Sequence, residues 1–256
     1  MKSHLKLDLW FLLLVCSFSA LAAVSAAESS NAPLRVGISP VFPPMAFKQG
    51  KELVGVEVDL ARGLGECLGR KIVFVELPFK DQIEALNNGR TDIIMSSMSI
   101  TPARRYVVHF THPYFLVGQM ALVRGEDRNQ YVLGFPLGME GPIGVVGATT
   151  GEFLVQRDFP KARRKTFANG SDAALALQKK KATMFIGDST HVWYLAGRYA
   201  NEGLTVVPLV LSEEPLAWAV RKSDEDLLTA ANDFITQSSQ DGSLRKVFRR
   251  WTAIGD

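Results

Sequence analysis

The chain has 256 residues, and its 29 lysines and arginines nearly balance its 26 aspartates and glutamates, giving a formal net charge of +3. Nucleic-acid-binding proteins usually carry a larger and more clustered positive charge, so nucleic acid is not an expected partner. The basic runs at 163–165 and 179–181 fit solvated surface. Without its N-terminal segment the chain has about 230 residues, which suits one large domain or two small ones.

The N-terminal 26 residues are expected to be a secretory signal peptide. Lys2 and Lys6 precede an apolar run from Leu9 to Val24, and small residues follow for cleavage. A membrane anchor is the alternative, but the run has only 16 residues, which is short for a bilayer span. Asp8 is unusual in a signal peptide. Removal of this segment takes away +1 of the formal charge of +3 and leaves +2.

The chain has two cysteines, Cys16 and Cys67. Cys16 lies in the signal segment, and Val15 stands where a lipoprotein signal has a small residue, so lipidation is not expected. An exported chain that keeps only Cys67 has no internal disulfide, and packing alone must stabilise it. Cys67 lies in an apolar helical pattern and is expected in the core. The four histidines show no metal-ligand spacing, and no nucleotide-binding glycine loop is present, so neither a metal nor a cofactor is expected.

Strands alternate with helices in chain order, which predicts βαβ units and parallel sheets in an α/β fold. Between the two halves, the stretch 125–142 is rich in Gly, Pro and charge and is expected to be a surface connection. The expected elements of the first half are strand 34–38, helix 58–68 ending at Gly69, strand 72–75, helix 81–86, turn 87–89 and strand 93–95. Those of the second half are strand 143–146, a helix from 151, helix 171–178 capped by Ser171 or Asp172, strand 184–186 and a helix around Trp193.

The C-terminal part is expected to form two amphipathic helices. Ser223 and Asp226 resemble a capping box, and an apolar stripe from 227 to 235 follows. Gly242 separates this helix from the last one, which spans 244–251. Two α/β sheets of this size predict two lobes, whose strands could present their carboxyl ends to one ligand-binding cleft.

The stretch 96–104 is the most informative motif. Small hydroxyl residues follow an apolar strand, Thr101 can cap the next helix, Pro102 suits its first turn, and Arg104 follows one turn in. Backbone N–H groups, hydroxyls and a guanidinium at the carboxyl end of a strand are suited to hold a small carboxylate. The alternative is an ordinary capped helix with a solvated arginine.

With this motif in place, the chain resembles the amino-acid-binding branch of bacterial periplasmic solute-binding proteins, family 3, which are receptors of ABC importers. Order and spacing of the matching stretches are kept over nearly the whole mature chain. They are 42–47 (FPPMAF), 53–61 (LVGVEVDLA), 92–104, 110–114 (FTHPY), 118–124 (GQMALVR), 143–145, 148–150 and 241–244 (DGSL).

The resemblance implies a two-lobed type II periplasmic binding fold, a clamshell with two hinge crossings. Lobe 1 would comprise 33–117 plus 216–256, and lobe 2 would comprise 118–215. It further implies a monomer in the periplasm that binds a free amino acid by hinge closure and delivers it to an ABC permease in the inner membrane. No catalysis is implied.

The resemblance also implies roles for single residues. Arg104 would take the α-carboxylate in a forked pair, with Thr150 and the adjacent Thr149 contributing from the second lobe. Asp188 would pair with the α-ammonium. Ser97 and Ser99 of the first lobe would also contact the ammonium. Ser96, in the same run of hydroxyl residues, is a further expected ligand-binding residue.

Phe42 and Phe79 match the two aromatics that sandwich the ligand side chain. The alternatives are that both are ordinary core, and that Asp188 only caps the helix starting at Ser189. Ser39 replaces an aspartate that relatives for cationic or amide side chains often carry. Val146 stands where the glutamine receptor has a lysine, and Gly187 precedes the ammonium-binding aspartate.

Because charged side-chain readers are missing from these positions, a neutral ligand side chain is expected. Ser39 could still bond a small polar group.

Three other functions are alternatives. Cyclohexadienyl dehydratase resembles this family and uses a glutamate at the position of His191, so the acid is missing here, and no Ser/His/Asp, paired-carboxylate or metal set is expected in the cleft. A periplasmic sensor of the same fold, not coupled to transport, is the main alternative. A carboxylic acid lacking an amine would leave Asp188 facing the ligand unpaired.

Overall fold

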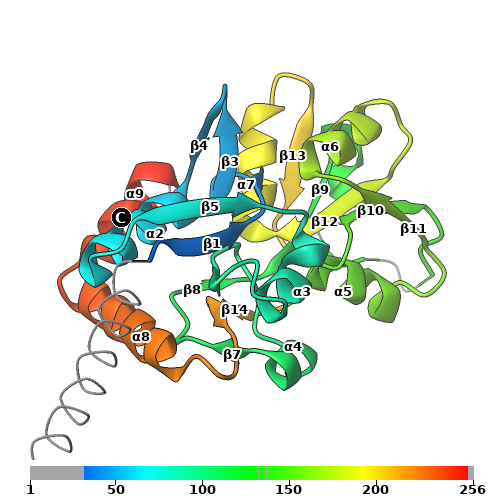
Figure 1. Ribbon diagram of the computed structural model, residues 1–256. Coiled ribbons are helices and arrows are strands. Elements are labelled where there is room, and N and C mark those ends of the chain that lie inside the picture. Colours follow the sequence, from blue (N-terminus) through cyan, green and yellow to red (C-terminus); the bar gives the residue numbers. More distant parts are fainter. Residues whose placement is uncertain (1–31, 132, 136–137, 253–256) are drawn as a thin grey trace, which may run out of the picture.

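The computed structural model describes residues 32–131, 133–135 and 138–252 (Figure 1). The expected signal peptide and Cys16 lie outside these residues. The strands are β1 Leu34–Ile38, β2 Val41–Phe42, β3 Ala46–Gln49, β4 Glu52–Val54, β5 Ile72–Glu76, β6 Ile93–Ile94, β7 His109–Phe110, β8 Phe115–Val117, β9 Gln119–Arg124, β10 Pro142–Val146, β11 Arg163–Phe167, β12 Met184–Asp188, β13 Leu204–Val207, β14 Glu214–Leu216 and β15 Ala219–Val220. The helices are α2 Val56–Leu68, α3 Gln82–Asn87, α4 Pro102–Val107, α5 Thr150–Asp158, α6 Gly170–Gln178, α7 Ser189–Arg198, α8 Glu225–Gln240 and α9 Ser243–Trp251, with short 3-10 helices η1 Phe79–Asp81 and η2 Gly125–Gln130. Among the described residues, no helix combines the length and apolarity needed to cross a membrane.

The chain builds two five-stranded sheets, so the expected α/β architecture with two sheet-containing lobes is confirmed. The first sheet has the order β5-β1-β6-β15-β7 and the second has the order β11-β10-β12-β9-β13. In each sheet the first two pairs in this order are parallel, and one strand runs against the others, β15 in the first sheet and β9 in the second.

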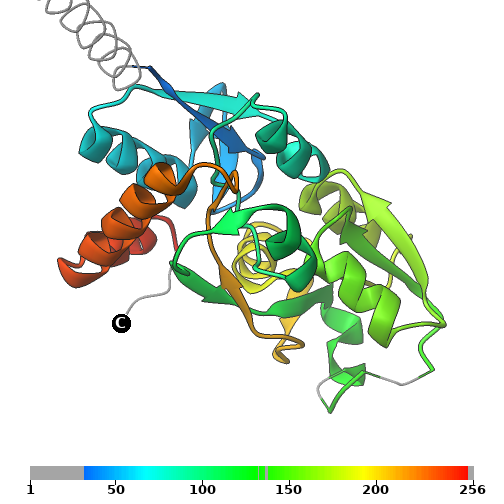
Figure 2. The ribbon, with the colours of Figure 1, turned by 60° about the horizontal axis from the view of Figure 1, so that its bottom comes forward.

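The chain passes between the two sheets twice, and the two passes lie side by side. β8 leads from the first sheet to β9 of the second, and β14 leads back to β15 of the first. β8 and β14 pair antiparallel, with Leu116 opposite Pro215. Figure 2 shows the returning segment in orange between the second sheet and the C-terminal helices.

Each sheet is covered by apolar helix faces. α2, α8 and α9 pack on the first sheet around the fully buried Trp218, with Leu64, Ile235 and Phe248 in the same cluster. This arrangement follows from the apolar stripes predicted for these helices. A second cluster combines Leu86 and Ile94 of the first half with side chains of the second half, and so joins the two sheets.

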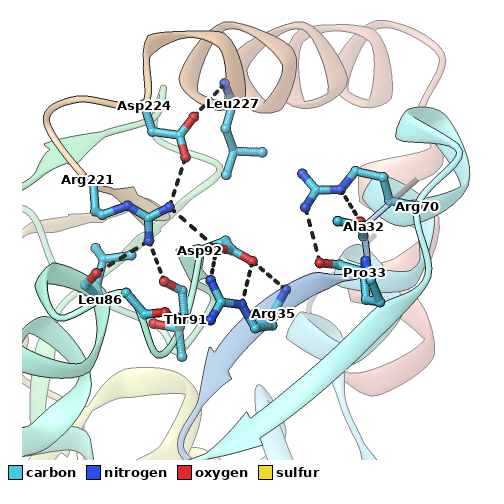
Figure 3. A network of polar contacts seen from close by, with 11 residues as sticks. Ala32, Pro33, Arg35, Arg70, Leu86, Thr91, Asp92, Arg221, Asp224 and Leu227 are labelled. Atoms are coloured by element: carbon cyan, nitrogen blue, oxygen red, sulfur yellow. Dashed lines mark hydrogen bonds and ion pairs between the residues drawn. The ribbon is translucent and has the colours of Figure 1, made fainter. Parts of the chain in front are cut away.

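An ion-pair network fixes the C-terminal return onto the first sheet (Figure 3). Asp92, just before β6, accepts from the Arg35 guanidinium at 2.6 Å and from Arg221 at 3.4 Å. Arg221 also donates to Asp224 at 3.2 Å and to the Thr91 carbonyl at 2.6 Å. Burial raises the pKa of Asp92, but hydrogen bonds from Arg35 outweigh it and leave the pKa below its ordinary value. The network therefore stabilises the sheet with Asp92 ionised.

Helix caps confirm some expectations and correct others. Thr101 caps α4, as predicted, by accepting from the Arg104 N–H. α6 starts one residue earlier than expected, so its cap is Asn169 and not Ser171 or Asp172. The cap of α8 is Asp224, which accepts from the Leu227 N–H, so the predicted box between Ser223 and Asp226 is wrong. In both corrected cases a neighbouring Asn or Asp competes successfully for the same orphan N–H groups.

Two further expectations are corrected. Cys67 is exposed, not buried: in the last turn of α2 it is Leu68, and not Cys67, that packs against the core cluster. The connection 125–142 is more than surface chain: it opens with η2, and Tyr131 is buried and stacks on Phe135 at 5.6 Å between ring centroids. Phe135 in turn contacts Phe159.

Candidate functional site

The carboxyl ends of parallel strands from both sheets meet at one place, as the fold class predicts. β6 leads into the serine loop 96–99, β10 into the start of α5, and β12 ends at Asp188. A small cavity of about 10 Å³ lies between these ends. It is lined by nine of the ten residues expected to bind ligand: Phe42, Phe79, Ser96, Ser97, Ser99, Arg104, Thr149, Thr150 and Asp188.

Arg104 lines this cavity and is buried, so it is not a solvated surface residue. Its guanidinium donates to the Ser99 carbonyl at 2.8 Å and to the Ala148 carbonyl of the second half at 3.0 Å. The same group lies over the Phe79 ring, 5.2 Å from its centroid. Burial lowers the pKa of Arg104, and the nearby carboxylates Asp188 and Glu214 oppose this shift. Arg104 therefore supplies a fixed cation to the site.

The second half contributes the start of α5. Thr149 caps this helix by accepting from the Glu152 N–H at 3.4 Å, and its hydroxyl donates to the Val146 carbonyl at 2.7 Å. Glu152 bonds back to the Ala148 N–H at 2.7 Å. These bonds hold Ala148 at a positive φ of 61°. The turn leaves the Thr150 hydroxyl and the positive end of a nine-residue helix facing the cavity.

Asp188 supplies the opposite charge. It precedes α7 but makes no capping bond to that helix, so the capping alternative is not what the structure shows. Instead Oδ1 accepts from Gln119 Nε2 at 2.6 Å, across the antiparallel pair of β12 and β9. Burial is the main cause that raises the pKa of Asp188 to about 6, and the neighbouring Glu214 raises it further.

Gln119 and Glu214 are site residues that the sequence reasoning missed. Gln119 is buried, and its amide also donates to Thr150 Oγ1 at 3.2 Å. Its close approach requires Gly151, because a Cβ there would lie 2.7 Å from Gln119 Oε1. Gln119 lies in the stretch 118–124 that carries part of the family resemblance, and this match could have identified it as a site residue.

Glu214 lies on the returning strand β14. Its carboxylate accepts from the Ser99 hydroxyl at 2.7 Å and from the Ser212 hydroxyl at 2.6 Å. Glu214 is close enough to Asp188 to raise its pKa, although Glu214 itself does not line the cavity. No nearby motif in the sequence pointed to it, because only the second chain crossing brings it to the site.

The serine loop is shaped by a buried acid. Glu57 accepts from the Ser97 N–H at 2.6 Å, from the Tyr114 hydroxyl at 2.6 Å and from Trp218 Nε1 at 3.0 Å. This holds Ser97 at a φ of 53°, a left-handed conformation unusual outside glycine. The buried Ser97 Oγ has no hydrogen-bond partner among the described residues and lines the cavity.

The aromatic wall consists of Phe42 and Phe79, whose rings meet edge to face at 5.6 Å. His191 stands behind Phe42 at 5.5 Å, at the position where the dehydratase-like alternative would need an acid. Burial lowers the pKa of His191 to about 4, so the imidazole is neutral near pH 7. Both phenylalanines are largely buried and also line the cavity, so each belongs both to the core and to the cavity wall.

Ser39 does not line this cavity, unlike the other nine expected residues. It is buried behind Ser96, whose Oγ accepts from the Ser39 N–H at 2.9 Å. It borders a neighbouring groove that lies on the other side of Phe79 and that also contains Val146 and Glu76. Glu76 in that groove is paired with Lys48.

The geometry joins one buried guanidinium, one buried carboxylate, several hydroxyls and two aromatic rings around a small space. Such a set can bind a small zwitterion with its acid on Arg104 and its amine on Asp188. Among the described residues no group of three or more His, Cys, Asp or Glu side chains could hold a metal ion.

The family model described as "Bacterial extracellular solute-binding proteins, family 3" matches residues 34–254. The probable histidine-binding protein of Neisseria gonorrhoeae is 29% identical over 94% of this chain and 93% of its own length. The glutamine-binding protein of an ABC transporter of Bacillus subtilis (strain 168) is 28% identical over 78% of this chain and 73% of its own length.

Solved structures agree with this fold. An ancestral amino-acid-binding protein, a precursor of cyclohexadienyl dehydratase, has a TM-score of 0.79 at 31% identity and covers 90% of this chain and 99% of its own. A putative ABC transporter binding component from Wolinella succinogenes DSM 1740, complexed with lysine, has a TM-score of 0.79 at 30% identity and covers 86% and 95%. With its two sheets and its matching family model, the chain belongs to the bacterial extracellular solute-binding proteins of family 3.

Proposed function

We propose that this protein is a periplasmic receptor that binds a free amino acid with a neutral side chain and delivers it to an ABC importer. One observation carries the proposal: Arg104 and Asp188, from different halves of the chain, line the same small cavity. Their opposite charges match the two ends of an amino-acid zwitterion. The relatives named for glutamine and histidine binding support the same ligand class.

The size of the cavity supports binding by hinge closure. A space of about 10 Å³ for water-sized spheres holds about one water molecule, so an amino acid enters only if the walls move apart. The walls come from both sheets, and the paired strands β8 and β14 are the connections between them. We therefore place the lobes at 33–117 plus 216–256 and at 118–215, with both hinge crossings at these strands.

The neutral ligand is inferred from the side-chain end of the site. Ser39 and Val146 border the groove beyond Phe79, and the acid in that groove, Glu76, is already paired with Lys48. A cationic ligand side chain would lack a free partner there, and burying it would be costly. The lysine seen in the Wolinella relative is therefore not expected as the ligand here.

The remaining features of the proposal follow the family. The N-terminal 26 residues would direct export to the periplasm, the partner would be an inner-membrane permease, and the receptor would act as a monomer. It would bind its ligand without catalysing a reaction, since the position of the dehydratase acid is held by the neutral His191.

The test uses the full chain expressed in a bacterial host and purified from the periplasm, with its mass checked for loss of residues 1–26. Thermal unfolding and calorimetry with each of the twenty amino acids then define the ligand. We expect one or more neutral amino acids to raise the melting temperature and to bind tightly. Tight binding of lysine or arginine would contradict the neutral ligand, and no stabilisation by any amino acid would overturn the receptor proposal.

A further inference from the structure

The hydroxyl of Ser99 has only one hydrogen, and the structure shows where it goes. Ser99 Oγ lies 2.7 Å from Glu214 Oε2, and an ionised carboxylate only accepts hydrogen bonds. Ser99 must therefore donate to Glu214. What Ser99 Oγ can still offer to the cavity that it lines is acceptor capacity.

A second fixed bond sets the opposite polarity on the other side. Gln119 Nε2 donates to Thr150 Oγ1 at 3.2 Å, so the hydrogen of Thr150 remains free to be donated. Thr150 Oγ1 lies 3.4 Å from Ser99 Oγ, and between these two atoms only Thr150 can be the donor. The bonds therefore run in one direction, from Gln119 through Thr150 and Ser99 to Glu214.

This direction matches the two ends of a zwitterion. A ligand carboxylate needs donors: Arg104 provides them, and Thr150 can turn its one hydrogen from Ser99 toward the ligand. A ligand ammonium needs acceptors, which Asp188 and Ser99 provide. Glu214 itself does not line the cavity. It reaches Ser99 from β14, where Ser212 Oγ donates to its second oxygen at 2.6 Å and holds it in place.

We propose that Glu214 is a positioning residue for amine recognition. By accepting the hydrogen bond of the Ser99 hydroxyl, Glu214 leaves Ser99 Oγ as an acceptor toward the cavity and so selects ligands that present an ammonium there. This rests on the proposed amino-acid receptor function. A 2-hydroxy acid offers a hydroxyl that both donates and accepts, so it tolerates either orientation of Ser99 and depends less on Glu214.

The test compares two probes: the amino acid that binds the wild type most tightly and its 2-hydroxy acid analogue. In Glu214→Ala, calorimetry is expected to show about a tenfold loss of affinity for the amino acid, the size of one hydrogen bond to a charged group. The loss for the 2-hydroxy acid is expected to be about threefold or less. Glu213→Ala is the matched control, because its neighbour Glu213 is exposed.

A double-mutant cycle with Ser99→Ala separates this role from a general electrostatic one. We expect Glu214→Ala to change amino-acid affinity little once Ser99 is already alanine. An equal loss for both probes, or the full loss in the Ser99→Ala background, would overturn the inference. If Glu214→Ala does not fold, Glu214→Met keeps the length and removes both acceptors. If no amino acid binds the wild type, the receptor function fails first and the inference falls with it.

Discussion

Acidification should weaken ligand binding through Asp188. The pKa of this carboxyl is raised to about 6, mainly by burial, and the ligand ammonium must pair with its ionised form. Well above pH 6, as at pH 7.5, the group is almost fully ionised, and binding is at full strength. As the pH falls through 6, the carboxyl takes up a proton and the charge pair is lost.

The size of the effect follows from the fraction of Asp188 that is ionised. This fraction is about 97% at pH 7.5 and about 9% at pH 5 for a pKa of 6, so the apparent Kd should rise about tenfold. The free amino acid stays mostly zwitterionic over most of this range. His191, with a pKa lowered to about 4, stays mostly neutral and adds little.

The assay is isothermal titration of the tightest-binding amino acid between pH 5 and 7.5, with Asp188→Asn as the control. The variant should bind weakly at every pH and show a nearly flat profile. A wild-type affinity that is constant down to pH 5 would refute the reasoning. So would a tenfold slope that persists in Asp188→Asn, because another group would then be titrating.

Three further substitutions test the site and its support. Arg104→Ala should abolish measurable amino-acid binding in calorimetry, while the exposed neighbour variant Arg105→Ala should bind like the wild type. Glu57→Gln turns an amide N–H toward a buried donor such as Trp218 Nε1. The free energy of unfolding, measured with urea, should therefore fall by about 1–3 kcal/mol. Gly55→Ala should lower the melting temperature, because Gly55 has a φ of 126° and a Cβ would lie 2.4 Å from a backbone carbonyl; an unchanged melting temperature would contradict this steric reasoning.

Local rules were sufficient wherever one short segment decides the structure. The cap at Thr101, the stop at Gly69 and the apolar stripe of α8 were all readable, because capping, left-handed glycine and helical periodicity act within a few residues. The family resemblance implied the nine residues that line the cavity. βαβ topology explains why the segments after β6, β10 and β12 meet there, since parallel strands place their carboxyl ends at one edge.

The sequence could not supply features that depend on tertiary neighbours. Cys67 sits on an apolar pattern, but in the last turn of α2 the neighbouring elements cover Leu68 and leave Cys67 exposed. Glu214 is far from the serine loop in sequence and reaches Ser99 only through the second chain crossing. Asn169 and Asp224 show that neighbouring capping residues compete, and that one-residue shifts of a helix start decide the winner.

The position of β15 has a consequence for the order in which the molecule assembles. β15 lies between β6 and β7, so the first sheet is incomplete until residues 219–220 have been synthesised. The second sheet uses only strands between residues 119 and 207, an uninterrupted stretch of chain. We therefore expect the strands of the second sheet, in the middle of the polypeptide, to pair first. The edges of β6 and β7 that pair with β15 would stay unpaired until the C-terminal segment is present.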